Sequence, residues 1–344
     1  MRSDPVSQTL EAQPPAASTG KARDLSAAVG PLLHRWGLAL VLVATVAFFS
    51  VQLPGVFLTW SNLHDMIAAQ APILLLALAA GVVLVVGEFD LSLGATLSLT
   101  QYVALLLMTS SGTPVGLATA IALGIGVVIG AVNVLLVVGA SVNSFIATIA
   151  VQTVLLGLAT LVSNGNQPIF AGAPAAFTAI GNTEILSVPL SVWIALAIAL
   201  ALWLLLDRTT FGRTMRASGA NRAAARLSGL RVTRALVVAL VLASALAAVA
   251  GLLEASRTGT SDSVSGSFLI MPAYAAAFLG ATGSKHGQFS VPGTLIAILL
   301  VAVGVTGLQL MGAASWVTNV FNGTVLIVAV LLSQLARRST ARRS

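Results

Sequence analysis

Long apolar stretches, separated by short polar or glycine- and proline-containing connections, dominate the pattern of this chain. Each approaches the roughly 20 residues that an α-helix needs to cross the hydrocarbon core of a bilayer. Ten stretches qualify, at 34–53, 64–87, 92–110, 114–138, 143–163, 188–206, 234–256, 268–283, 291–310 and 316–335. The pattern predicts an all-α integral membrane protein with about ten transmembrane helices.

Two regions depart from this pattern. Pro272 and the glycines at 280 and 283 interrupt the eighth stretch, so we expect a broken span, a half-helix or a re-entrant hairpin covered by protein. Residues 1–33 are rich in Pro, Ala and Ser without an apolar period, which predicts a disordered cytoplasmic tail. The apolar segment after this tail exceeds a signal-peptide core and lacks a cleavage site, so we expect it to remain as a span.

Charge indicates the orientation of the spans. Only 8% of the residues are charged, against 57% hydrophobic. The basic residues behind the net charge of +7 cluster between the apolar stretches, which indicates a protein embedded in membrane lipid and not one that binds nucleic acid. Because Lys and Arg remain cytoplasmic, the transmembrane domain 34–336 should carry an arginine-rich cytoplasmic loop at 207–234 and end in a basic cytoplasmic tail, 337–344. Ten spans then place both termini in the cytoplasm and the connection 164–187, without Lys or Arg, outside.

An inverted repeat of spans two to five onto spans seven to ten is one interpretation of the order of the segments. "SFIATIAVQTVL" from Ser144 and "SWVTNVFNGTVL" from Ser315 share several positions and open spans that run in opposite directions. Chance similarity between apolar segments is the alternative.

The motif "GEFDLSLG", residues 87–94, places acidic and hydroxyl side chains at the foot of span two. Asp90 or Ser92 could cap the next helix by accepting from its free N–H groups. A buried carboxylate also costs at least about 2.5–3.5 kcal/mol at the bilayer centre unless it faces a cavity or a partner, and transporters line substrate paths with such helix breaks. The two interpretations are compatible.

The chain resembles the permease subunits of ribose-type bacterial ABC importers for monosaccharides. "GEFDLSLGATLSLT" is similar to their GGIDLSVGS signature, and "NSFIATIAVQTVLLGLATLVSNG", "FGRTMRASGANRAAARLSGLRV", "AGLLEASRTGT" and "VPGTLIAILLVAVGVTGLQLMG" match further segments in order, over residues 60 to 335. The departures are Glu88 and Phe89 for Gly-Ile and Asn143 for Pro.

The resemblance implies a multi-pass subunit of the bacterial cytoplasmic (inner) membrane that imports a pentose or hexose by alternating access. It implies three partners: a second permease chain, identical or not, a cytoplasmic ATPase subunit and an extracytoplasmic substrate-binding protein. ATP would bind to the ATPase, since no P-loop pattern occurs here, and no cofactor is expected in this chain. The chain would not itself be an enzyme.

Polar side chains in or near the spans are the candidates for the substrate path. They are Asp90, Ser92, Asn143, Ser144, Gln152, Asn164, Asn319 and Asn322. Amides and hydroxyls can donate to and accept from sugar hydroxyls. Each could instead join neighbouring helices, a contact worth about 0.6 kcal/mol on average.

The arginine-rich linker contains a short predicted helix. Asn221 can cap a helix from Arg222 to Ser228, which Gly229 would stop. The resemblance identifies Ala223 to Gly229 as the loop that couples to the ATPase, with Ala223 in place of the motif's Glu, so that Arg222 or Arg226 would supply electrostatic docking. The coupling candidates are Arg213, Gly219, Asn221, Arg222, Ala225, Arg226 and Gly229. Alternatively, the arginines only set orientation.

Other functions have weaker sequence support. An ion-coupled secondary transporter would use Glu88, Asp90 and Glu254 as proton or cation sites, and an ABC importer could carry a nucleoside or another sugar-like solute. The three histidines are scattered and cysteine is absent, so we expect no metal site.

Overall fold

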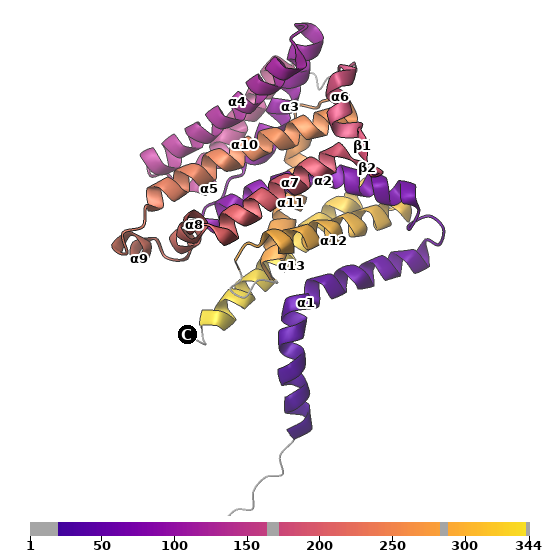
Figure 1. Ribbon diagram of the computed structural model, residues 1–344, viewed down its shortest axis with the longest axis vertical. Coiled ribbons are helices and arrows are strands. Elements are labelled where there is room, and N and C mark those ends of the chain that lie inside the picture. Colours follow the sequence, from indigo (N-terminus) through magenta and orange to yellow (C-terminus); the bar gives the residue numbers. More distant parts are fainter. Residues whose placement is uncertain (1–19, 164–171, 283–287, 342–344) are drawn as a thin grey trace, which may run out of the picture.

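The computed structural model describes residues 20–163, 172–282 and 288–341, which are predominantly helical (Figure 1). The elements are α1 (Gly20–Gln52), α2 (Trp60–Val85), α3 (Ser92–Ser110), α4 (Val115–Val134) with the π-helical turn η1 (Leu135–Gly139), α5 (Ser144–Val162), α6 (Ala175–Asn182), β1 (Glu184–Ile185), β2 (Val188–Pro189), α7 (Leu190–Trp203) with the π-helical turn η2 (Leu204–Arg208), α8 (Thr210–Ala220), α9 (Arg222–Leu227), α10 (Val232–Thr258), α11 (Ser265–Thr282), α12 (Val291–Leu310) and α13 (Ser315–Ala341). The two short strands form an antiparallel hairpin.

Nine helices in the described part of the chain are long and apolar enough to cross a bilayer. They coincide with the second to tenth predicted stretches. The first predicted stretch lies in α1, whose apolar part, Trp36–Gln52, is shorter. Because α1 begins at Gly20, residues 20–33 of the expected disordered tail are helical, and residues 1–19 lie outside the described residues.

The eighth predicted stretch is not broken, contrary to expectation. It forms the continuous 18-residue helix α11, with Pro272 inside it. Pro272 is buried and α11 packs against α2, α3, α12 and α13, and such neighbouring helices allow a span to contain a proline. Gly280 lies against the backbone of Gly293 and Thr294, so its lack of a side chain permits close packing instead of ending the helix.

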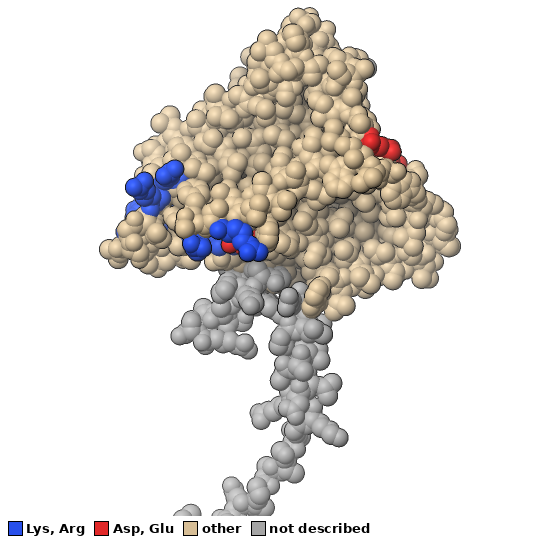
Figure 2. All heavy atoms as spheres, in the orientation of Figure 1, with Lys and Arg blue, Asp and Glu red and all other residues tan. Residues whose placement is uncertain are grey.

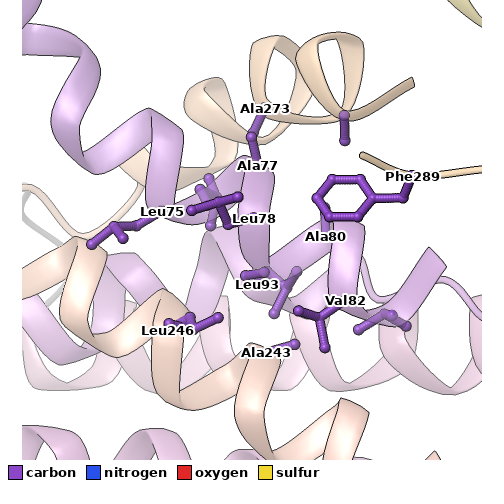
Figure 3. Packing of buried hydrophobic residues seen from close by; sticks show 14 of the residues in the cluster. Leu75, Ala77, Leu78, Ala80, Val82, Leu93, Ala243, Leu246, Ala273 and Phe289 are labelled. Carbon is purple, nitrogen blue, oxygen red and sulfur yellow. The ribbon is translucent and has the colours of Figure 1, made fainter. Parts of the chain in front are cut away.

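Four central helices, α2, α3, α10 and α11, form the core. In the most apolar 18-residue stretches of α2 and α3, 72% and 78% of the residues are buried, against 28% in α4 and 6% in α13. Figure 3 shows Leu78 and Val82 of α2 packed between Ala273 of α11 and Ala243 of α10. The outer helices therefore present apolar faces to lipid or to a partner chain, as membrane helices do.

The packing has the pattern of an inverted repeat of α2–α5 onto α10–α13. Helix α3 packs against α4 and α5 just as α11 packs against α12 and α13, and α10 packs on α4 as α2 packs on α12. Exchanging the two sets of four helices thus reproduces the same neighbours. The comparison supports the predicted repeat over chance similarity.

The turn from α2 to α3 and the turn from α10 to α11 carry the same residues at the same spacing. Gly87, Asp90 and Gly94 have counterparts with equal spacing in Gly259, Asp262 and Gly266. Gly87 and Gly259 both have positive φ, at 79° and 67°. Each aspartate accepts a hydrogen bond from the backbone N–H two residues later, at 3.0 Å for Asp90 and 2.9 Å for Asp262.

The two halves touch directly at Gly94 of α3 and Gly266 of α11. A Cβ atom on Gly94 would lie 2.6 Å from the carbonyl oxygen of Gly266. The Ser98 hydroxyl accepts a hydrogen bond of 2.8 Å from the Gly266 N–H at the same crossing. Only glycine permits this approach of two helix backbones.

Charged side chains gather at the ends of the bundle. In the view of Figure 2, mainly basic side chains, with a little acidic surface among them, lie at the end occupied by α8 and α9. Acidic side chains lie near β1 and the start of α2, and the surface between the two ends is uncharged. This distribution fits a membrane-embedded body with two water-exposed ends.

Candidate functional site

Residues 86–91, which we call the Asp90 turn, connect α2 to α3, and side chains from two other helices bind their backbone N–H groups. The backbone N–H of Phe89 donates to the Ser144 hydroxyl at 3.2 Å, and that of Leu91 donates to the Thr148 hydroxyl at 3.1 Å. The N–H of Asp90 donates to the Tyr274 hydroxyl at 3.0 Å, which in turn donates to the Asp90 carbonyl at 2.9 Å. The non-helical backbone is thus satisfied by α5 and α11, as a turn shielded from water requires.

The Asp90 carboxylate is fully buried at the centre of this turn. It accepts from the Ser92 N–H at 3.0 Å, the Ser92 hydroxyl at 2.5 Å and the Asn133 amide of α4 at 3.1 Å. Asp90 therefore binds the first backbone N–H of α3, as one of the two interpretations of the motif predicted. Asp90 and Ser92 have no exposed surface here, so their place on the substrate path stays a prediction.

Glu88 joins the Asp90 turn to the arginine-rich linker. One carboxylate oxygen accepts from the Ser144 hydroxyl at 2.5 Å, and the other forms an ion pair with Arg222, the first residue of α9. Arg222 also donates to the Val86 carbonyl at 3.3 Å. Glu88 itself is 8% exposed, so its charge is almost removed from solvent.

A polar pocket of about 340 Å³ opens beside this ion pair. It is lined by residues that include Glu88, Ser141, Asn143, Ser144, Arg222 and Arg226. Two of these were predicted for the substrate path and two for coupling to the ATPase. The fold thus brings two members of each predicted set together in one cavity.

Aromatic rings cover the other side of the turn. Phe89 stacks on the buried Tyr274 ring with centroids 6.2 Å apart and lies near Phe278 at the same distance. Phe145, the second residue of α5, meets Phe89 edge to face at 6.5 Å. The Phe89 and Phe145 side chains remain 39% and 49% exposed and form an aromatic surface beside the polar turn.

The remaining path candidates lie at varied positions. Asn143 caps α5, accepting from the N–H groups of Phe145 and Ile146 at 3.0 and 3.4 Å. Gln152 is partly exposed on the same helix. Asn319 is exposed and Asn322 partly exposed on α13, and Asn164 lies outside the described residues. Of the path candidates that the structure describes, Asn143 and Ser144 are the two that line the pocket beside Glu88.

The predicted helix of the linker is present. Helix α9 runs from Arg222 to Leu227, Asn221 caps it by accepting from the Ala224 N–H at 3.0 Å, and Gly229 follows with φ of 75°. Ala225 is buried, whereas Arg213 of α8 and Arg226 of α9 are exposed. Gly219, near the end of α8, lies against the backbone of Val85 and Gly87.

Arg222, one of the two arginines expected to dock on the ATPase, pairs its guanidinium with Glu88. Which of Arg222 and Arg226 supplies the docking charge stays a prediction. Three residues that hold the Asp90 turn were not predicted from the sequence: Asn133, Thr148 and Tyr274. The spacing of Gly87, Asp90 and Gly94 recurs in the second half of the chain, and aligning the two turns could have revealed this correspondence from the sequence.

Comparison with known proteins gives consistent matches. The family described as "Branched-chain amino acid transport system / permease component" matches residues 62–330. The ribose import permease protein RbsC of Escherichia coli is 32% identical over 85% of this chain and 90% of its own length. RbsC of Bacillus subtilis is 33% identical over 88% of this chain and 94% of its own, and the autoinducer 2 import system permease protein LsrD of Yersinia enterocolitica is 32% identical over 75% and 78%. No solved structure matches significantly.

Proposed function

This chain belongs to the family of branched-chain amino acid transport system permease components, and from that membership we propose that it is the membrane subunit of an ATP-driven importer of a monosaccharide. The observation that carries the proposal is the similarity to ribose import permeases over 85% or more of the chain. A pentose such as ribose is the favoured substrate class, and another sugar-like solute is the alternative, since an autoinducer 2 import permease is also similar.

We propose that two such chains, identical or different, enclose the path. The exposed rings of Phe89 and Phe145 and the polar start of α5 would face a weakly bound sugar, with aromatic surface for its apolar face and amide or hydroxyl groups for its hydroxyls. Asn164, Gln152, Asn319 and Asn322 remain candidates for further contacts.

The partners follow from the same proposal. A cytoplasmic ATPase subunit would bind ATP and grip α8 and α9, and an extracytoplasmic substrate-binding protein would dock at the opposite end, on connections that include 164–187. Both termini would be cytoplasmic in a bacterial inner membrane. This chain would contribute the path and no catalysis.

The carboxylates that an ion-coupled carrier would use have partners here. Glu88 pairs with Arg222, Glu254 of α10 pairs with Arg257 at 3.1 Å, and Asp90 accepts three hydrogen bonds. Paired carboxylates also occur in the proton relays of transporters, so the preference for the ATP-driven importer rests on the similarity to ribose import permeases.

Reconstitution tests the proposal. The permease is placed in vesicles with the ATPase and binding protein encoded beside it, and uptake of radiolabelled ribose is measured. We expect uptake only with ATP and both partners, and no uptake from a proton or sodium gradient alone. Gradient-driven uptake by the permease alone would contradict the proposal, and uptake of another pentose or furanose in place of ribose would redefine the substrate.

A further inference from the structure

We propose that the ion pair between Glu88 and Arg222 is the link that carries a displacement of α9 to the Asp90 turn. Glu88 and Arg222 would be positioning residues that act on the substrate path through the turn. The inference rests on the proposed function, because it assumes that a separate ATPase moves α9. It assigns a role to a carboxylate that the sequence motif leaves unexplained.

One end of the link is fixed to the linker. Arg222 is the first residue of α9, and the side chain of Asn221 closes the helix end immediately before it. The guanidinium reaches the Asp90 turn twice, at the Glu88 carboxylate and the Val86 carbonyl. A shift of the α9 start therefore pulls directly on residues 86 and 88.

The other end is fixed to the substrate-path elements. The second carboxylate oxygen of Glu88 binds the Ser144 hydroxyl at 2.5 Å, and that same hydroxyl receives the Phe89 N–H at 3.2 Å. Glu88 thus connects the starts of α9 and α5 within one side chain. Because its charge is nearly buried, loss of Arg222 would leave the carboxylate without its compensating charge.

A second contact stiffens the same junction. Gly219 of α8 lies so close to the backbone of Val85 that a side chain there would overlap the Val85 carbonyl. Gly87 approaches Gly219 in return, with a Cβ position 3.3 Å from its carbonyl oxygen. Because of this backbone contact, the connection between α8 and α9 cannot move across the Asp90 turn without displacing the turn. The Gly219 contact and the Glu88–Arg222 ion pair therefore act at the same junction.

Arg226 provides the contrast. It lies one turn later on α9 and is exposed, and no ion pair joins it to the described residues. Arg226 is therefore suited to an acidic surface of the ATPase, whereas the guanidinium of Arg222 is bound to the Asp90 turn. A helix that combines both contacts can receive a displacement on one side and deliver it on the other.

The test compares E88Q, R222Q and the double variant in vesicles that contain the ATPase and binding protein. The measured quantity is sugar taken up per ATP hydrolysed. We expect each single variant to lower this ratio about five- to tenfold, the lower part of the range for coupling between sites, and the double variant to lower it no further. Binding of the ATPase should persist in E88Q, since Glu88 is not on the docking surface.

Two matched variants make the result specific. R226Q removes the same charge from the same helix, and we expect it to weaken binding of the ATPase, which E88Q should not do. E254Q breaks the remote Glu254–Arg257 pair and should leave the ratio unchanged. A wild-type ratio in E88Q, or additive losses in the double variant, would overturn the link. A wild type that shows no ATP-driven uptake would instead overturn the proposed function.

Discussion

Asp90 illustrates what a local motif predicts and what it leaves out. Its carboxylate accepts the first N–H of α3, which the sequence motif predicted, and also the Asn133 amide, which no local pattern indicates. Asn133 is distant in sequence and reaches the turn only because α4 packs on α3. Residue chemistry was therefore predictable within the motif, whereas its partners on other helices were not.

We expect Asp90→Asn to reduce transport strongly while assembly persists. An asparagine offers one acceptor oxygen and directs an amide donor toward groups that are donors themselves. A hydrogen bond to a charged group contributes about 1.5–3 kcal/mol. The substitution should therefore lower the free energy that stabilises the turn by a comparable amount. Uptake in vesicles and the thermal midpoint in detergent measure the two effects.

Asp262→Asn is the matched control, because Asp262 occupies the corresponding turn of the second half and also accepts from the N–H two residues later. Its exchange should affect stability more than uptake. Wild-type uptake by Asp90→Asn would reduce Asp90 to a helix cap.

Helix boundaries were the most predictable feature of the elements. The predicted limits of α3 and α12, and the cap and stop of α9, agree with the structure to within about one residue. The α11 prediction failed because proline and glycine were interpreted by local propensity alone. In a membrane the surrounding helices decide whether such residues interrupt a span.

Helix α9 gives a prediction for the stop residue. Gly229→Ala places a side chain at φ of 75°, which costs about 1–2 kcal/mol and should distort the end of α9. We expect normal membrane insertion and a loss of uptake per ATP. Gly55→Ala is the control, since Gly55 has φ of 74° in a loop far from α9 in sequence and is likewise free of close neighbours. Equal losses in the two variants would argue against a specific role for α9.

The contact between α4 and α10 gives a second prediction at this scale. A Cβ on Gly130 would lie 2.7 Å from the Val241 Cα, whereas nothing lies within 4 Å of one on Gly124. Gly130→Ala should therefore destabilise the fold by about 1–3 kcal/mol, the usual cost of overpacking. Gly124→Ala on the same helix should be neutral or slightly stabilising. Thermal unfolding in detergent compares the two, and equal midpoints would contradict the packing.

At the scale of the whole molecule, the absence of cysteine from the sequence makes orientation directly measurable. Single cysteines at Arg226 and Glu184 probe opposite ends of the bundle, in α9 and in β1. An impermeant thiol reagent applied to intact cells should label the cysteine at 184 and not the one at 226. Labelling at 226 from outside would reverse the topology and remove the basis for an ATPase docking there.

The arrangement of the two halves was only partly visible in the sequence. The similarity of the segments at Ser144 and Ser315 indicated a repeat, but apolar segments share few residue types and could not establish it. Packing of equivalent helices supplies the missing information, because contacts between distant segments leave little trace in one sequence.

The meeting of Gly94 and Gly266 restricts which sequences can keep this architecture. In most helix crossings a larger residue on one side can be offset by a smaller one opposite, so that mutations compensate in pairs. Here both partners already have the smallest side chain available, and neither can shrink to accommodate the other. No substitution at the partner position can compensate for a larger residue at either glycine. Each of the two positions should therefore remain glycine on its own account, whereas other contacting pairs can change size together.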